Sequence, residues 1–428
     1  MTGLTGGDPR LFQLRQAASA AAAAGRWDDA ARLWQQFLTL APGHCEALHF
    51  LGQRALQRGD VFGARQLFEQ ANPPDPMVLL GLAFACRQLG DDPCEMAALT
   101  TALTLDPYCY PALLAKGASF ERHGLRRRAA QIYKDALKIV PPDERLSPAL
   151  RADVVRARAV VQQSMVDLDA FLETKLSALR AQHASSALAR IDVAKEAMVG
   201  RSKIYTSEAS LLRLPQLPAV PFFDRAHFPW LAALEAKTDI IRAELAALLQ
   251  TTKAEFAPYL NYPADAPLEQ WVELNGSPRW TSLYLWKDGA RIEKNCALCP
   301  GTVAALADIP LASIPGGEPL AMFSALEPHT HIPPHTGITN ARSVVHLPLI
   351  LPGQCRFRVG HETREWKLGE AWVFDDSIEH EAFNDSDELR VILIFNVWNP
   401  YLSQAEQASA AALIAGYYDY LNADLAAV

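Results

Sequence analysis

The chain has 428 residues, of which 50% are hydrophobic and 21% charged, a composition typical of globular proteins. This length predicts two or more domains. The net charge of −8 argues against general nucleic-acid binding, which needs a basic surface. No apolar run approaches the roughly 20 residues that span a bilayer, and the N-terminus does not read as a signal peptide. Seven thinly spread cysteines suit a reducing compartment, so we expect a cytoplasmic protein without a membrane span or a nucleic-acid partner.

A repeat fills the first third of the chain. Four glycines are spaced 34, 31 and 34 residues apart, and a proline follows each of them 17 residues later. Alanine recurs five positions after the glycines, except that the third unit has Glu95, which marks that unit as degenerate. This is the pattern of tetratricopeptide repeats, in which paired helices pack closely and a proline follows the second helix. The pairs are Gly25 with Pro42, Gly59 with Pro76, Gly90 with Pro107, and Gly124 with Pro141.

We therefore predict an all-α tetratricopeptide solenoid over residues 1–145. Stacked helix pairs form a curved array whose concave face often binds peptides. The partner that we expect is a protein or peptide substrate docked on this array, and an array that only scaffolds or dimerises is the alternative. Arg126, Arg127 and Arg128 stand at a predicted helix start and are expected to face solvent.

The segment 146–205 is predicted to be a helical cap or linker, because apolar residues recur at helical spacing over about 148–198. A proline-rich stretch over 214–224 marks the entry into a C-terminal domain, for which we predict the range 206–428. One further helix is expected over about 228–250, where apolar residues again form a stripe.

The C-terminal domain has the alternation of β-structure. Short β-branched and aromatic runs are separated by turn signals, with no helical period between them, which favours a small antiparallel barrel or jelly roll. The predicted fold class is therefore α+β and multidomain, with a helical solenoid followed by this barrel. The predicted strands are 280–286, 343–351, 355–359, 371–374 and 389–395.

Histidines gather in this predicted barrel. His335 and His380 each stand at a strand end, so they could meet across the barrel mouth and bind a first-row metal as neutral imidazoles. A third, carboxylate ligand two residues after His335 is missing, because that position is Gly337. Arg390 lies in an otherwise apolar strand, where a buried guanidinium needs a partner such as a dicarboxylate.

Other residues compete for these roles. On spacing alone His329 and His331 could also be ligands, and we prefer to place them in a polar rim beside the metal. Asp375 or Asp376 could be a third ligand or could orient a ligating imidazole or water. Cys296 and Cys299 have no second pair of cysteines and no nearby histidine, so we expect them to be structural. His361 stands in a predicted turn and is expected to face solvent.

Several spaced motifs, from about Leu217 onward, resemble the aspartyl/asparaginyl β-hydroxylase family. Members of that family are Fe(II)- and 2-oxoglutarate-dependent oxygenases built on a double-stranded β-helix, a jelly-roll fold of the cupin type. The motifs are His335-Thr336-Gly337-x-Thr339-Asn340-x-Arg342, His346-Leu347, Phe374-Asp375-Asp376-Ser377, Glu379-His380-Glu381 and Val397-Trp398-x-Pro400.

The resemblance implies a full set of site residues. Fe(II) ligands correspond to His335 and His380, and Asp376 to an aspartate that acts from beside the metal without binding it. The positions that bind 2-oxoglutarate correspond to Ser324, His346 and Arg390. Animal members have a further cofactor-binding Arg where this chain has Val344, and Arg342 is the residue that we expect to substitute for it.

By resemblance, the reaction is hydroxylation of the β-carbon of an Asp or Asn residue, in a peptide or protein that the repeats recruit. Two alternatives stay open. The first is a 2-oxoglutarate oxygenase that acts on a small molecule or a lipid-linked group. The second is a catalytically silent partner-binding protein, for which Val344 is the supporting feature.

Overall fold

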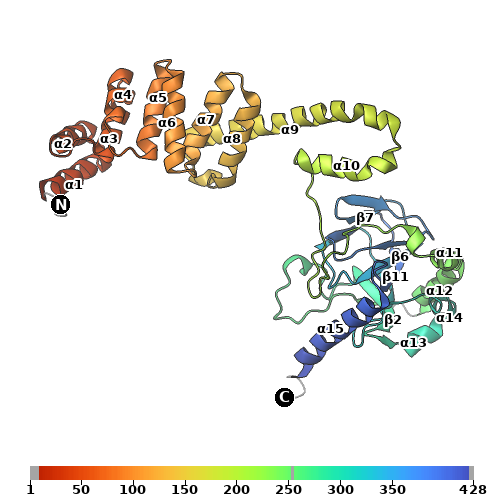
Figure 1. Ribbon diagram of the computed structural model, residues 1–428. Helices are drawn as coiled ribbons and strands as arrows, with labels where there is room; N and C mark the ends of the chain where they lie inside the picture. The colour runs from red at the N-terminus through yellow and green to blue at the C-terminus, as the bar shows by residue number, and fades with distance from the viewer. Residues whose placement is uncertain (1–8, 252–254, 424–428) are drawn as a thin grey trace. The chain divides into compact units, whose positions relative to one another are not determined.

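The computed structural model of the chain describes residues 9–251 and 255–423. Its contacts divide the chain into two compact units, Met1–Leu188 and Ala189–Val428 (Figure 1). The first unit is a helical repeat array and the second contains two β-sheets with flanking helices, which confirms the predicted α+β fold class. The domain boundaries predicted at 145 and 205 stay predictions.

The first unit consists of helix pairs at the expected period. Each turn glycine lies between the two helices of a pair with a positive φ, from 70° at Gly25 to 80° at Gly59, a conformation that glycine adopts without steric cost. The helices are α1 (Pro9–Ala23), α2 (Trp27–Leu40), α3 (Cys45–Gln57), α4 (Val61–Glu69), α5 (Pro76–Gln88), α6 (Asp92–Leu105), α7 (Tyr110–Arg122) and α8 (Arg126–Ile139).

Small residues let the two helices of a pair approach closely. A Cβ on Gly52 would lie 2.4 Å from the Phe68 ring, and a Cβ on Gly117 would lie 2.3 Å from the Tyr133 ring. The degenerate unit also has a structural explanation. Glu95 is 2% exposed, and its carboxylate accepts hydrogen bonds from Arg122 (2.6 Å) and from the Ser119 hydroxyl (3.2 Å).

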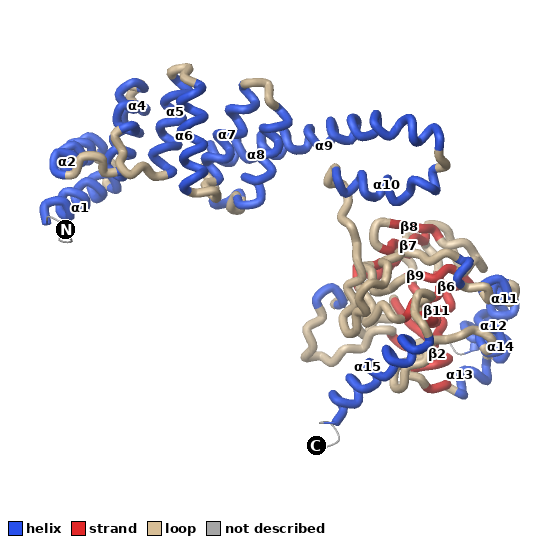
Figure 2. The backbone as a smooth tube through the Cα atoms, viewed as in Figure 1, coloured by secondary structure: helices blue, strands red, loops and turns tan. Residues whose placement is uncertain are grey.

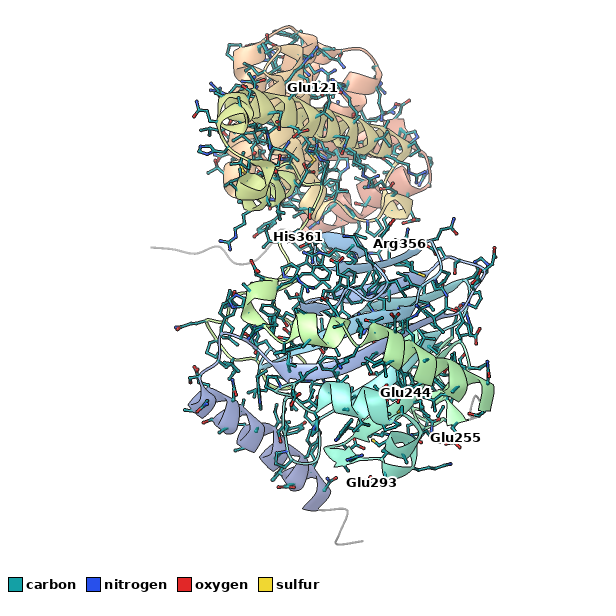
Figure 3. The ribbon with its side chains drawn as sticks, turned by 90° about the vertical axis from the view of Figure 1, so that its right-hand side faces the viewer. Glu121, Glu244, Glu255, Glu293, Arg356 and His361 are labelled. Atoms are coloured by element: carbon teal, nitrogen blue, oxygen red, sulfur yellow. A yellow bond between two sulfur atoms is a disulfide. The ribbon has the colours of Figure 1, made fainter. Side chains whose placement is uncertain are left out.

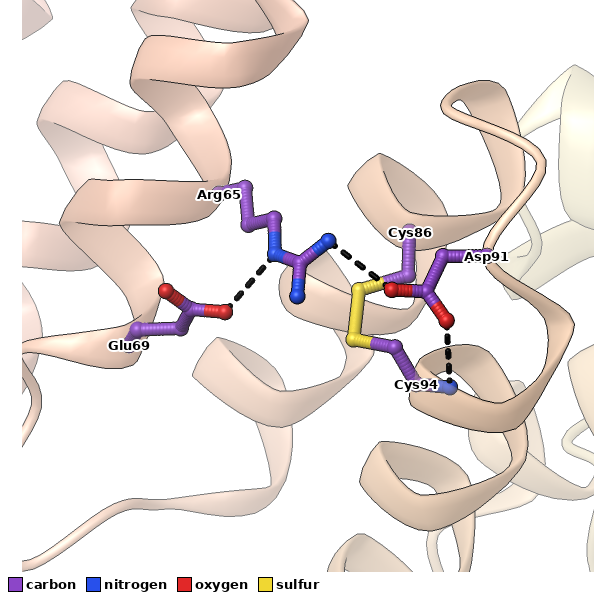
Figure 4. The surroundings of a disulfide bond; sticks show 5 residues. All are labelled: Arg65, Glu69, Cys86, Asp91 and Cys94. Carbon is purple, nitrogen blue, oxygen red and sulfur yellow. Dashed lines mark hydrogen bonds and ion pairs between the residues drawn. A yellow bond between two sulfur atoms is a disulfide. The ribbon is translucent and has the colours of Figure 1, made fainter.

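A disulfide joins Cys86, at the end of α5, to Cys94 in the first turn of α6, with their Cα atoms 5.8 Å apart (Figure 4). Between them Asp91 accepts a hydrogen bond from the Cys94 backbone N–H (3.1 Å), which caps α6. The cysteine spacing did not predict this bond. Arg65 links the pair to the preceding helix, because it donates to Asp91 (2.9 Å) and to Glu69 (2.7 Å).

Two predicted helices are divided in the structure. The expected helix over 148–198 consists of α9 (Pro148–Gln182) and α10 (Ser185–Met198), and the extended backbone of His183 ends α9 although no Gly or Pro signals the break. The expected helix over 228–250 consists of α11 (Leu231–Glu235) and α12 (Thr238–Thr251). There the Thr238 hydroxyl donates to the Glu235 carbonyl (2.7 Å), a local bond that competes with the helical pattern.

Two antiparallel sheets form the body of the second unit (Figure 2). The seven-stranded sheet has the order β1-β2-β4-β11-β6-β9 with β3 on β2, and the four-stranded sheet has the order β5-β10-β7-β8. The strands are β1 (Ala257–Pro258), β2 (Trp280–Lys287), β3 (Ala290–Arg291), β4 (Ala321–Leu326), β5 (Thr330–His335), β6 (Arg342–Ile350), β7 (Cys355–Val359), β8 (Glu362–Glu365), β9 (Trp372–Phe374), β10 (His380–Asn384) and β11 (Arg390–Trp398).

The large sheet is buried on both faces, which separates its residues into two cores. On β6, Val345, Leu347 and Leu349 pack with α11 and α12 in one core, whereas Val344 belongs to the other core with residues of the small sheet. Because side chains alternate along a strand, Arg342 and His346 face the same way as Val344. The alternation on β6 therefore sends two polar side chains into the space between the sheets.

Helices cover the outer face of the large sheet. Glu244 on α12 fixes α14 (Pro300–Leu306), because its carboxylate accepts hydrogen bonds from the Gly301 and Thr302 backbone N–H groups (2.6 and 2.7 Å; Figure 3). Two further helices complete the unit, α13 (Glu293–Leu298) and α15 (Gln404–Ala423). No helix among the described residues is long and apolar enough to cross a membrane.

Candidate active site

His335 and His380 are cross-strand neighbours. β5 ends at His335, β10 begins at His380, and the two strands pair antiparallel with these residues opposite each other. Their ring centroids lie 4.1 Å apart. The pairing explains why two histidines 45 residues apart in sequence meet at one point between the sheets.

Backbone carbonyls fix the tautomer of both rings. Nδ1 of His335 lies 2.8 Å from the Pro333 oxygen, and Nδ1 of His380 lies 3.0 Å from the Ile378 oxygen. A ring that donates its proton from Nδ1 keeps a lone pair on Nε2, the form that binds metals. Burial lowers the pKa of His335 to about 3 and that of His380 to about 4, so both rings are neutral near pH 7.

The Asp376 carboxylate fills the space beside Gly337. A Cβ on Gly337 would lie 2.1 Å from Oδ2 of Asp376, and the Gly337 N–H donates to the Asp376 backbone oxygen (2.7 Å). Oδ2 also accepts a hydrogen bond from Arg342 (3.1 Å), whereas Oδ1 is buried with no hydrogen-bond partner among the described residues. Position 337 has no carboxylate of its own, and the carboxylate of Asp376 lies in the space beside it. Desolvation raises the pKa of Asp376.

Arg390 is a buried guanidinium without a carboxylate partner. Arg390 is 1% exposed. In the described part of the chain, its Nε has no hydrogen-bond partner and no acidic side chain pairs with its guanidinium. Its guanidinium carbon lies 4.9 Å from the centre of the Trp366 ring, and burial lowers its pKa to about 10. An unpaired charge of this kind is costly unless a ligand supplies the anion.

Ser324 and His346 lie on the same inner surface as Arg390. Ser324, on β4, accepts a hydrogen bond from the Trp280 indole N–H (3.2 Å). His346, on β6, is 6% exposed, and its buried Nδ1 has no hydrogen-bond partner within residues 9–251 and 255–423. Burial, with the Arg390 charge nearby, lowers the pKa of His346. The structure therefore brings together the hydroxyl, imidazole and guanidinium that were predicted to bind 2-oxoglutarate, and their unused polar atoms fit a carboxylate-bearing cofactor.

Arg342 forms ion pairs with two buried carboxylates. Besides its bond to Asp376, its Nε lies 3.0 Å from Oε1 of Glu318, a close ion pair without hydrogen-bond geometry. Glu318 is 6% exposed and accepts a hydrogen bond from Asn396 (2.6 Å). The role of Arg342 toward the cofactor stays a prediction. Glu318 was missed by the sequence analysis, because its Gly-Gly-Glu-Pro setting reads as an ordinary turn.

The predicted site residues line one cavity of about 330 Å³. It is formed by inward-facing side chains of both sheets, and by an aromatic wall that the sequence did not reveal. Trp271 stands edge-on to His335 (5.2 Å between centroids), and Tyr259 stacks on Trp280 (4.1 Å). The site residues on this cavity are Ser324, His335, Arg342, His346, Asp376, His380 and Arg390.

The competing histidines lie outside the cavity. His329 is exposed and contacts Asp387 (2.9 Å), and His331 stacks on Phe383 and contacts Glu381 (2.8 Å). His361 lies in the exposed turn between β7 and β8, as expected (Figure 3).

Asp375 and the two cysteines Cys296 and Cys299 also make their contacts outside the cavity. Asp375 does not line the cavity, and its carboxylate accepts hydrogen bonds from the Ser377 N–H (3.0 Å) and hydroxyl (2.5 Å). Cys296 and Cys299 are buried and lie beside backbone oxygens, and burial raises the pKa of Cys299 to about 12. Among the described residues no group of three or more His, Cys, Asp or Glu side chains is placed to hold a metal.

A strap, residues 205–214, holds the two loops that carry the site. Its backbone N–H groups donate to the Ser377 oxygen (Glu208, 2.7 Å) and to the Ile338 oxygen (Leu212, 3.0 Å). Further along, the Asn340 side chain exchanges two hydrogen bonds with the Leu214 backbone (2.8 and 2.9 Å). One loop follows His335 and the other contains Asp376 and precedes His380, so the strap touches both sides of the candidate metal site.

Comparison with known proteins identifies relatives of the C-terminal part of the chain. A family model described as aspartyl/asparaginyl beta-hydroxylase matches residues 235–400. An ornithine lipid ester-linked acyl 2-hydroxylase of Rhizobium tropici is 34% identical over 202 residues, which are 46% of this chain and 68% of that protein. An aspartyl/asparaginyl beta-hydroxylase of Homo sapiens is 31% identical over 211 residues, 48% of this chain and 26% of the human protein.

Solved structures resemble parts of the chain at low identity. The crystal structure of MamA protein aligns with 50% of this chain at 15% identity and a TM-score of 0.31. A thermophilic TPR protein of Thermus thermophilus aligns with 37% of the chain at 21% identity and a TM-score of 0.28.

Proposed function

Because the chain belongs to the aspartyl/asparaginyl β-hydroxylase family, we propose that its second unit is an Fe(II)- and 2-oxoglutarate-dependent hydroxylase. The observation that carries this proposal is that two neutral imidazoles share one cavity with buried Arg390, which has no acidic partner among the described residues. The imidazoles fit a metal and the guanidinium fits a carboxylate of the cofactor.

The chain's own residues would bind, orient and shield the reactants. His335 and His380 would hold the metal, and Arg390 with Ser324 would hold the distal carboxylate of 2-oxoglutarate. When bound, Fe(II) and 2-oxoglutarate activate O2 for insertion into a C–H bond. One O2, one 2-oxoglutarate and one substrate C–H give the alcohol, succinate and CO2, with one oxygen atom in the alcohol and one in succinate.

Asp376 has a positioning part in this proposal. Its unpartnered Oδ1 would accept a hydrogen bond from a water or an imidazole beside the metal, and Arg342 holds its other oxygen in place. The aromatic wall of Tyr259, Trp271 and Trp280 would keep bulk water out of the cavity.

Two substrate classes are candidates. The family resemblance favours the β-carbon of an Asp or Asn residue in a peptide or protein. The similarity to the Rhizobium tropici enzyme favours the acyl chain of a lipid, which is the group that its name gives as its substrate.

We also propose that the helical repeats bind a protein or peptide partner. Their unit contains a hollow of about 320 Å³. Its lining combines apolar side chains such as Leu80 and half-exposed Phe84 with the charged groups of Arg87 and Asp153, a mixture that suits a peptide. A substrate docked here would be held on the same chain as the hydroxylase, which raises its effective concentration at the site.

The decisive experiment measures succinate formed from 2-oxoglutarate in air with added Fe(II). We expect slow turnover by the wild type that disappears in His380→Ala and persists in His331→Ala, since His331 lies outside the cavity. Calorimetric binding of 2-oxoglutarate to the Mn(II)-loaded protein is measured in parallel. Neither binding nor turnover would favour the catalytically silent partner-binding protein instead.

A further inference from the structure

We propose that the site hydroxylates an uncharged aliphatic chain, and that it does not accept the carboxylate of an aspartyl residue. This inference rests on the proposed function, because it takes Arg390 to be the anchor of 2-oxoglutarate. It follows from the charges and the apolar surfaces of the cavity, taken residue by residue.

Two arginines line the cavity, and only one of them is free. Arg390 has no acidic partner in the described part of the chain, so its charge is available to one carboxylate, that of the cofactor. Arg342 contacts Asp376 and Glu318 at 3.1 and 3.0 Å, and both of these carboxylates are buried. The positive charge of Arg342 is thus already shared between two buried carboxylates. A third carboxylate beside Arg342 would find no unshared positive charge there.

The strand that carries Arg342 offers no other cation. Inward-facing positions of β6 follow each other as Arg342, Val344 and His346. Val344 is 8% exposed and places an isopropyl group between the two polar residues. His346 is neutral near pH 7, since its pKa is lowered by burial. With the cofactor in place, the described side chains that line the cavity therefore offer no unpaired cation for a substrate carboxylate.

The remaining lining suits hydrocarbon. Apolar side chains from β4, β5 and β11 face the cavity, including Met322, Ile332 and Ile392, and the rings of Trp271 and Trp280 stand on the side of His335. Burying a carboxylate against such a surface without a partner is unfavourable, whereas burying methylene groups stabilises a complex. A cavity of about 330 Å³ holds a cofactor and an extended chain.

The test compares four small probes on the full-length protein loaded with Mn(II) and 2-oxoglutarate, using calorimetry. N-methyl octanamide represents an acyl chain and N-acetyl-leucine N-methylamide an apolar side chain. N-acetyl-aspartate N-methylamide and its asparagine analogue represent the residues that the family resemblance suggests. We expect one of the two aliphatic probes to bind at least tenfold more tightly than the aspartate probe, and the stronger of the two identifies the source of the chain.

Two variants make the charge of the cavity lining more positive. Val344→Arg adds an unpaired cation, so we expect it to gain at least tenfold in affinity for the aspartate probe. Glu318→Gln keeps the hydrogen-bond acceptor for Asn396 and removes one of the two carboxylates that face Arg342, so we expect a gain of several-fold. This variant tests the inference even where Val344→Arg does not fold. Tighter binding of the aspartate or the asparagine probe than of both aliphatic probes by the wild type would overturn the inference.

The outcomes also separate this inference from the proposed function. If 2-oxoglutarate binds but neither aliphatic probe does, the substrate assignment is wrong while the hydroxylase proposal stands. If 2-oxoglutarate itself does not bind, the proposed function is wrong and its consequence falls with it.

Discussion

Gly337 and Asp376 share one space, because a Cβ on Gly337 would lie 2.1 Å from Oδ2 of Asp376 and 2.4 Å from its Cγ. The glycine is therefore required by the position of the carboxylate, and the carboxylate is held there by Arg342. We expect Gly337→Ala to displace Asp376 and to cost about 1–3 kcal/mol in the free energy of unfolding. The affinity for Mn(II), measured by calorimetry, should fall at least tenfold.

The control for this substitution is Gly353→Ala, because a Cβ there meets nothing within 4 Å. It should change neither stability nor metal affinity. Equal metal affinity for the wild type and Gly337→Ala would mean that Asp376 does not support the metal site.

Arg390→Met separates cofactor binding from folding. The substitution removes a buried charge that has no acidic partner in the described structure, so we expect the free protein to keep or gain stability. Binding of 2-oxoglutarate should weaken by two orders of magnitude or more, because the loss of a charge-assisted pair costs about 3 kcal/mol or more. Thermal unfolding with and without 2-oxoglutarate measures both effects, and a variant still stabilised by the cofactor would contradict the role of Arg390. Arg356→Met, whose side chain is half-exposed on β7, is the matched control.

Ser207 joins the strap to the site through hydroxyl groups. Its Oγ lies 2.7 Å from the Ser377 hydroxyl, which in turn lies 2.5 Å from Oδ1 of Asp375, and all three residues are buried. Removing one member of a buried hydrogen-bonded chain costs about 1–3 kcal/mol. We expect Ser207→Ala to lose that much stability in urea unfolding and to bind Mn(II) several-fold more weakly, whereas Ser207→Thr restores both. Exposed Ser210→Ala should behave as the wild type.

Asp375 should make the stability of the protein fall as the pH rises. Burial raises the pKa of this carboxyl from 3.8 to about 7 in the folded protein. The folded form thus binds the proton more tightly than the unfolded form. The resulting stability is present below about pH 4 and is lost as the pH rises through about 7.

Asp375→Asn removes this titration. The unfolding free energy of the variant, minus that of the wild type, should therefore increase between pH 4 and 7, by up to about 4 kcal/mol at about 1.4 kcal/mol per pKa unit. Subtraction cancels the opposite contribution of the buried histidines, which both proteins share. Exposed Asp387→Asn should give a flat difference, and a flat difference for Asp375→Asn would mean that its pKa is ordinary.

The repeats and the main strands could be predicted from sequence because each depends on a local rule. A turn glycine with positive φ between two helices leaves a fixed period, and alternating strands such as 343–351 leave a period of two. β4 was not predicted as a strand, because all six of its residues are buried and no alternation marks it. β5 contains two prolines, which argue against a strand.

Site residues could be predicted where the type of residue indicates the chemistry. They could not be predicted where their role depends on contacts between distant parts of the chain. Two histidines and an arginine in apolar strands indicated a metal and an anion. Nothing local indicated that Glu318 lies beside Arg342, or that Trp271 stands against His335, because each contact joins a strand residue to a segment distant from it in sequence. The Cys86–Cys94 disulfide was missed because no spacing rule requires it.

The strap determines where the chain can be shortened without disturbing the candidate site. The family match begins at residue 235, some 20 residues after the strap ends, so a shortened protein cut at that point would lose every hydrogen bond from the strap to residues 337–340 and 377. Such a fragment would still contain the proposed metal ligands, but it would lack the strap that holds the two loops beside them. The range that the family model matches is thus shorter than the range whose hydrogen bonds hold the candidate site together.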